Sequence, residues 1–201
     1  MPEITSIKPQ KNGKRVNIYL DNKFGFGIDL ENFVVLNLKE GKEYAQEEIN
    51  EIVKKAEFQK TLDKLLRFAT LRPRSEREIK NWLKKKKIHE SLNNELFKRL
   101  EHLELLDDEK FTKWWIDQRL SFKPRGKKAL KYELFQKGID KQIIQKILNE
   151  SKIDETKIAK ELLKKNAYKW KKYKGYKEKQ KKSQFLARKG ISWYSINKLI
   201  N

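Results

Sequence analysis

Apolar and polar residues alternate in two short segments near the N-terminus, with the spacing of β-strands that bury one face. The two apolar series are Val16, Ile18 and Leu20, followed by Phe24, Phe26 and Ile28. Asn12-Gly13 precedes the first series and Asp21-Asn22-Lys23 separates the two, and Asn, Asp and Gly tolerate the positive φ of tight turns. The pattern predicts a three-stranded antiparallel meander within residues 1–29.

The apolar residues take up helical spacing beyond this meander. Asp29 is placed to cap a short helix near 30–37. From about residue 46, apolar residues recur every three or four positions. They are Ile49, Ile52, Val53 and Ala56, then Leu62, Leu65, Leu66 and Ala69. Pro73 interrupts this series, and Ser75 with Glu78 is typical of a capping box that starts a further helix.

The helical part of the sequence repeats itself with a period near 50 residues. Arg72-Pro73-Arg74-Ser75 is matched 51 positions later by Lys123-Pro124-Arg125-Gly126. Gly138-Ile139 is matched 52 positions later by Gly190-Ile191. A fixed period of this length predicts stacked helical units.

We therefore expect a mainly α-helical protein built as a tandem array of three three-helix repeats, elongated and curved. A small antiparallel β-rich N-terminal extension precedes the array. The expected divisions are 1–45 for the extension, 46–105 for the first repeat with a lead-in helix, 106–152 for the second repeat and 153–201 for the third.

Composition narrows the function. The 201 residues include 49 Lys and Arg against 28 Asp and Glu, a net charge of +21, which favours a polyanionic partner. The sequence has no cysteine and two histidines, so thiolate zinc sites, disulfides and three-histidine metal sites are excluded. No apolar run approaches the roughly 20 residues of a membrane span. We expect a cytoplasmic protein without a cofactor.

Candidate catalytic patterns are incomplete. Gly25-Phe26-Gly27 lacks the third glycine and the following helix of a dinucleotide loop, and His89-Glu90 has Asn93 where a zinc protease needs its second histidine. Asp107-Asp108 is best interpreted as a helix cap, because no further ligands or nucleophile accompany it. We therefore expect no enzymatic activity.

The positive charge is concentrated in the last quarter of the sequence. Residues 153–201 hold 15 Lys and Arg against 4 Asp and Glu, a net charge of +11. Ten lysines between Lys164 and Lys182 are interleaved with Tyr168, Trp170, Tyr173 and Tyr176. Lysines with aromatic residues suit phosphate contacts and base stacking, although repeat helices also need aromatic residues as core.

Three signatures resemble those of the RecX family of bacterial recombinase regulators. They are Arg72-Pro73-Arg74-Ser75 with Glu78-Ile79 and Leu83, then Leu103 to Phe111, and then Lys123-Pro124-Arg125-Gly126 through Gly138-Ile139. The resemblance covers about 56–201, and the strand-rich N-terminus is similar to the extension of some members. Glu104 departs from the usual glycine, and the third repeat has lost the proline of its first loop.

The resemblance implies a non-enzymatic modulator of RecA that lies in the groove of the RecA–DNA filament and restrains recombinase, ATPase and co-protease activities. The implied partners are the RecA filament and single-stranded or double-stranded DNA, with no membrane, and we expect a monomer. Basic residues of the middle helices are the expected contacts: Arg74, Arg77, Lys80, Lys84, Arg125, Lys127, Lys128, Lys131, Lys177, Lys181 and Lys182.

A general nucleic-acid-binding protein is the alternative, because three-helix units overlap with helix-turn-helix geometry. Its difficulty is the dominance of lysine, which gives affinity without reading bases. A membrane-surface adaptor fits less well, because the basic helices lack a wide apolar face.

Overall fold

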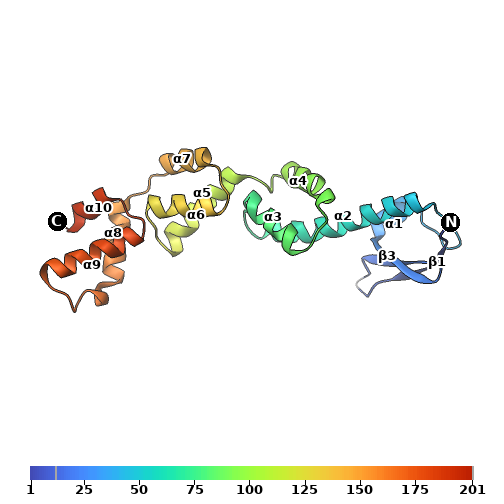
Figure 1. The fold of residues 1–201 in the computed structure, drawn as a ribbon, viewed down its shortest axis with the longest axis horizontal. Helices are drawn as coiled ribbons and strands as arrows, with labels where there is room; N and C mark the ends of the chain where they lie inside the picture. The colour runs from blue at the N-terminus through green and yellow to red at the C-terminus, as the bar shows by residue number, and fades with distance from the viewer. Residues whose placement is uncertain (12, 201) are drawn as a thin grey trace. The chain divides into compact units, whose positions relative to one another are not determined.

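The computed structural model describes residues 1–11 and 13–200 and contains the predicted mixture of a small sheet and many helices (Figure 1). The chain divides into two compact units. The first comprises Met1–Arg72 and Lys87–Leu100, and the second comprises Pro73–Lys86 and the residues from Glu101 onward. The predicted division of the chain at 45, 105 and 152 stays a prediction.

The N-terminal meander is confirmed. Strands β1 (Ile4–Pro9), β2 (Arg15–Leu20) and β3 (Lys23–Asp29) form an antiparallel sheet in the order β1-β2-β3. Asp21 and Asn22 have φ values of 46° and 64°, as a tight turn between β2 and β3 requires. Gly13 also has positive φ, whereas Asn12 of the other predicted turn lies outside the described residues.

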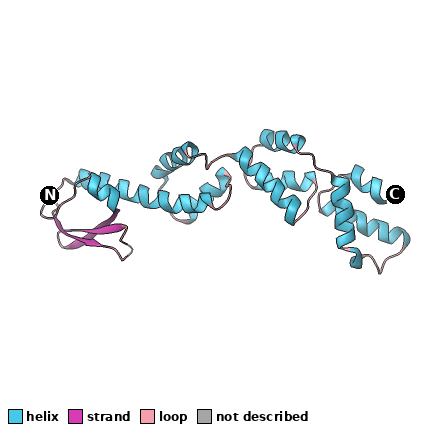
Figure 2. Cartoon of the chain, turned by 180° about the vertical axis from the view of Figure 1, so that it is seen from behind, coloured by secondary structure: helices cyan, strands magenta, loops and turns pink. Residues whose placement is uncertain are grey.

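One face of this sheet is covered by the start of a long helix (Figure 2). Asp29 caps α1 (Leu30–Val35) as predicted, because its carboxylate accepts the Asn32 backbone N–H. Helix α2 (Gln46–Thr70) then runs without a break through both predicted apolar series. Its buried residues Ile49, Ile52 and Ala56 share one core with the sheet. The sheet and the start of α2 are therefore held together by one hydrophobic core.

The remaining helices follow in groups. The bounds are α3 (Glu76–Lys85), the 3-10 turn η1 (Glu90–Leu92), α4 (Asn93–His102), α5 (Asp108–Phe122), α6 (Lys127–Gln136), α7 (Lys141–Glu150), α8 (Glu155–Lys165), the 3-10 turn η2 (Ala167–Lys169), α9 (Gly175–Arg188) and α10 (Trp193–Ile200). Helices α5–α7 enclose one apolar core that includes Phe111, Leu130 and Ile144. Helices α8–α10 enclose another that includes Ala159 and Leu186. The second and third three-helix repeats are therefore real packing units.

The predicted equivalence of the repeated motifs is confirmed. Pro73 and Pro124 each lie three residues before the first residue of a middle helix, α3 or α6. Gly138 and Gly190 each lie two residues after the last residue of a middle helix, α6 or α9, and both have positive φ. Lys87, with φ of 54°, occupies the corresponding place after α3, 51 positions before Gly138. The period therefore marks the starts of α3 and α6 and the ends of α3, α6 and α9.

Helices α3 and α6 each begin against the end of the next middle helix along the chain. The Ser75 hydroxyl accepts the Glu78 N–H and donates to the Lys137 carbonyl oxygen at 2.9 Å. One repeat later, the Gly126 N–H donates to the Lys189 carbonyl oxygen, also at 2.9 Å. The start of α3 is thus joined to the end of α6, and the start of α6 to the end of α9.

An acidic residue completes each of these junctions. Asp108, the first residue of α5, accepts the Glu76 N–H at 3.1 Å, and Glu155, the first residue of α8, accepts the Lys127 N–H at 2.8 Å. Asp107 caps its own helix by accepting the Lys110 N–H, as predicted for this carboxylate pair. Unpaired N–H groups at helix starts are costly when buried, so each repeat supplies an acceptor that the preceding one needs.

The third repeat departs from the pattern at its first loop, as its sequence indicated. Helix α9 has 14 residues where α3 and α6 have 10, and it begins at Gly175 with φ of 55°. The loop before it holds the short turn η2 and no proline. The N-cap residue of α9, Lys174, makes no side-chain capping hydrogen bond, whereas the Ser75 side chain caps α3.

Substitution of Gly190 tests the junction between α6 and α9. A Cβ at Gly190 would lie 2.3 Å from the Ala129 backbone nitrogen, whereas a Cβ at Gly175 meets no atom within 4 Å. Both glycines have positive φ, so Gly175→Ala should cost about 1 kcal/mol of stability through backbone strain alone. We expect Gly190→Ala to cost a further 1–3 kcal/mol or so from the steric clash. Urea unfolding followed by tryptophan fluorescence measures both, and equal losses would contradict a tight junction.

Asp108 gives the junction a pH dependence. Burial raises the pKa of its carboxyl above the ordinary value, against the lowering effect of the Glu76 N–H. At pH values between the ordinary pKa and the raised pKa, the folded chain keeps this proton and the unfolded chain has lost it. The free energy of unfolding therefore falls as the pH rises through this interval. Asn at this position keeps an oxygen acceptor without the charge. We expect Asp108→Asn to be at least as stable as the natural protein at neutral pH, with its advantage vanishing below about pH 4.

The matched comparison is Asp108→Ala, which removes the acceptor and should cost about 1 kcal/mol. Urea midpoints from about pH 3.5 to pH 7 follow all three proteins. If Asn and Ala at position 108 are equally destabilising at neutral pH, the charge itself holds the junction and our interpretation is wrong.

Candidate functional site

The predicted contact residues lie on or just before the three middle helices, but they differ in accessibility. Six are exposed, four are partly buried and one is buried. The exposed residues are Arg77, Lys80, Lys84, Lys128, Lys131 and Lys177, the partly buried ones are Arg125, Lys127, Lys181 and Lys182, and the buried one is Arg74. The structure therefore divides the predicted contact residues into exposed, partly buried and buried cations.

Arg74 belongs to the interior. Its side chain is only 9% exposed, and its Nη1 lies 3.9 Å from Oε2 of Glu78, one helical turn further on. The other oxygen of Glu78 accepts from the Lys137 ammonium at 2.7 Å. Arg74, Glu78 and Lys137 thus form a charged group within the junction of α3 with α6, a position that favours a structural role for Arg74.

Arg125 has a comparable position in the next repeat. Glu133 on α6 pairs with Arg119 at 2.6 Å and lies 3.6 Å from Nε of Arg125. The Trp115 indole N–H donates to the same carboxylate at 3.0 Å. The guanidinium of Arg119 also lies over the Trp115 ring, 4.3 Å from its centre. Arg125 therefore shares a carboxylate that already has two other donors.

Sequence reasoning missed Glu133 and Lys137 as members of these groups. Both lie on the repeated middle-helix segment, and Lys137 immediately precedes the repeated Gly138. Lys137 also lies 4.7 Å above the Trp115 ring, so it connects both charged groups. The repeat itself is the signal that could have found them, because residues beside a repeated helix end face the neighbouring unit of the array.

Several of the remaining predicted cations have local partners. Lys80 pairs with Glu76, Lys182 pairs with Glu178 at 2.6 Å, and Arg77 donates to the Gln136 carbonyl oxygen at 3.2 Å. Within the described residues, no carboxylate partner is found for the exposed side chains of Lys84, Lys128, Lys131 and Lys177. These four lysines, on α3, α6 and α9, keep their charge available to an external anion.

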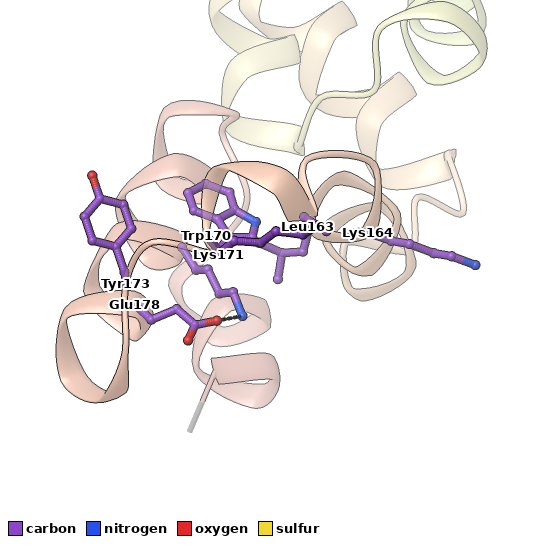
Figure 3. A pocket seen from close by; sticks show the side chains of 8 residues that line it. Leu163, Lys164, Trp170, Lys171, Tyr173 and Glu178 are labelled. Carbon is purple, nitrogen blue, oxygen red and sulfur yellow. Dashed lines mark ion pairs between the residues drawn. The ribbon is translucent and has the colours of Figure 1, made fainter.

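The aromatic residues of the lysine-rich segment divide between core and surface. Trp170 is 8% exposed and packs edge-on against Phe185 at 5.3 Å, whereas Tyr168 and Tyr176 are exposed. A cavity of about 420 Å³ adjoins Trp170 (Figure 3). The ion pair of Glu178 with Lys182 lies at this cavity and neutralises part of its charge. Trp170 is therefore a core residue, and base stacking by the exposed tyrosines stays a prediction.

No cluster of acidic, histidine or cysteine side chains with the arrangement of a metal site is found in residues 1–11 and 13–200. The histidine of the incomplete zinc-protease pattern has a local partner, since Nδ1 of His89 accepts the Ser91 N–H at 3.3 Å. Over the same described ranges, none of the helices combines the length and apolarity that crossing a membrane requires.

Three family models match the chain. The RecX N-terminal domain matches residues 2–44, the second three-helix domain of RecX matches 107–148, and its third three-helix domain matches 153–200. The second range covers α5, α6 and most of α7, and the third range contains α8–α10, the helices that enclose the two helical cores.

Similar curated proteins are named regulatory protein RecX. A regulatory protein RecX from Bacillus licheniformis is 35% identical over 199 residues, covering 98% of this chain and 76% of the relative. One from Listeria welshimeri is 32% identical over 149 residues, covering 74% of this chain and 55% of the relative. The chain therefore spans little more than half the length of the Listeria protein.

Solved structures agree in fold. A crystal structure of regulatory protein RecX superposes with a TM-score of 0.74 at 25% identity, covering 100% of this chain and 98% of the other. The RecX structure from Lactobacillus salivarius gives 0.62 at 23% identity over 72% of this chain and 94% of the other, which supports the fold alone. Because family models, relatives along nearly the whole chain and a full-length structural match agree, this chain belongs to the RecX family of regulatory proteins.

Proposed function

We propose that this chain is a non-enzymatic regulator of RecA that binds in the groove of the RecA–DNA filament. There it restrains the recombinase, ATPase and co-protease activities of the filament, acting in the cytoplasm as a monomer. Membership of the RecX family is the observation that carries this proposal. The geometry of the basic residues supports it independently.

Exposed cations recur at equivalent positions of successive middle helices. Arg77 on α3 corresponds to Lys128 on α6, and Lys80 corresponds to Lys131, each pair 51 residues apart. A filament presents identical protomers at regular intervals, so a chain with repeated basic positions gains from binding several of them at once. Attraction between the +21 chain and a DNA-containing filament adds to the rate of association.

The alternative is a general nucleic-acid-binding protein without RecA specificity. The +11 charge of residues 153–201 and the exposed rings of Tyr168 and Tyr176 favour it, because lysines and aromatic rings bind single strands without sequence preference. Such a protein acts by covering DNA, whereas a regulator that contacts protomers acts at far fewer copies.

Charge reversal on the middle helices tests the proposal. We expect Lys84→Glu, Lys128→Glu and Lys131→Glu together to raise the concentration for half-inhibition of RecA ATP turnover about tenfold, since three contacts of about 0.5 kcal/mol each are lost. The control reverses three exposed lysines of the third repeat, Lys160, Lys171 and Lys179, with the same change in net charge. It should change half-inhibition by less than about threefold.

The assay measures ATP turnover by preassembled filaments against the ratio of this protein to RecA, at two DNA and two salt concentrations. The natural protein should inhibit well below one copy per protomer. If inhibition needs strand-saturating amounts and excess DNA abolishes it, the nucleic-acid-binding alternative replaces the RecA proposal.

A further inference from the structure

A second cavity lies within the junction of the second and third repeats. It has a volume of about 200 Å³, below the roughly 300 Å³ at which sites for whole small molecules begin. Its walls come from the loop after α5, the end of α8 and the end of α9. The lining residues are Phe122, Lys123, Pro124, Arg125, Leu162, Lys165, Asn166 and Lys189. This size suits a single chemical group of a larger ligand.

Four of these eight residues are cations, and none of the eight is acidic. Arg125 is partly neutralised by Glu133, at 3.6 Å. Lys123, Lys165 and Lys189 have no carboxylate partner among the described residues. The cavity therefore gathers positive charge that the protein leaves uncompensated, unlike the Trp170 cavity, where Glu178 pairs with Lys182.

Lysines commonly collect at helix ends because backbone carbonyl groups attract them there, and Lys189 is the C-cap of α9. That attraction stabilises the charged form and raises a lysine pKa. The pKa of Lys189 is lowered instead, first by burial and then by the nearby charges of Arg125 and Lys169. The helix end therefore does not balance the crowding of positive charge at this cavity.

We propose that this cavity binds a backbone phosphate of a single-stranded nucleic acid, with Phe122 as the platform for an adjacent base. Phe122 is 73% exposed and forms part of the cavity wall, so its ring is available for stacking. A phosphate beside Lys123, Lys165 and Lys189 supplies the negative charge that the protein does not.

A nucleic acid fits this cavity better than an acidic protein segment. Carboxylates are held most specifically by the two-pronged guanidinium of arginine, and Arg125 is already directed at Glu133. The remaining cations are lysines, which act as point charges toward phosphate. An unpaired base can stack its π face on the exposed ring of Phe122 beside these lysines.

Two neighbouring lysines provide a matched test. Lys164 and Lys165 are both exposed in the last turn of α8, but Lys165 lines this cavity and Lys164 lines the Trp170 cavity. Lys165→Gln should weaken binding of oligothymidylate at least threefold more than Lys164→Gln. It should also reduce the slope of log K against log salt by about 0.7, the loss of one phosphate contact on a single strand.

Phe122→Ala addresses the base platform, with Phe135→Ala as the control at another exposed phenylalanine. We expect Phe122→Ala to weaken binding of oligothymidylate about fivefold or more, since stacking contributes about 1–3 kcal/mol per base. Binding of an abasic strand of equal length should not change. Circular dichroism of each full-length variant verifies that it is folded.

The probes are oligothymidylate, the abasic strand and polyglutamate, without RecA, so this result is independent of the ATP-turnover assay. Equal losses for the two lysine variants overturn the proposal. So does a Lys165→Gln loss on polyglutamate as large as on oligothymidylate, because an acidic protein segment is then the occupant. A Phe122→Ala loss that is equal on the abasic strand overturns the stacking contact.

Discussion

Hydrogen bonding across the repeat junctions is the constraint on which the helical part of the structure depends. Helices α3 and α6 begin beside the buried residues Ser75 and Gly126, where the first N–H groups of each helix need an acceptor. Asp108 serves α3, and Glu155 serves α6. The second oxygen of Glu155 also accepts the Ser192 N–H just before α10, so one carboxylate satisfies two helix starts. Apolar cores fill the second and third repeats, and these acids hydrogen-bond across the junctions between repeats.

This constraint also shapes the surface. Much of the limited supply of acidic residues is used inside junctions or within local pairs, as with Glu78, Glu133 and Glu155. The lysines outnumber such partners, so those at the helix surfaces and around the small cavity remain uncompensated. The basic exterior follows from the net charge of +21, and both proposed functions use it.

The structural features that depend on local sequence patterns could be predicted from the sequence. Alternation gave the meander, Asp29 and Ser75 gave helix starts, and the repeated Pro-Arg and Gly-Ile motifs gave equivalent ends of middle helices. Side-chain accessibility was less predictable, because it depends on the neighbouring repeat. Arg74 and Arg125 are equivalent in sequence, yet the partners of Arg74 include Glu78 and those of Arg125 include Glu133, at different helical positions. The surroundings of Lys189 likewise depend on residues 20 or more positions away in the sequence.

The direction of capping along the chain has a consequence for synthesis. The groups that complete α3 and α6 come from later residues: Asp108 and Lys137 for α3, and Glu155 and Lys189 for α6. A ribosome delivers the chain from its N-terminus, so α3 and α6 emerge before their acceptors exist. The first and second repeats must therefore wait for the repeat that follows before the starts of α3 and α6 reach their final structure.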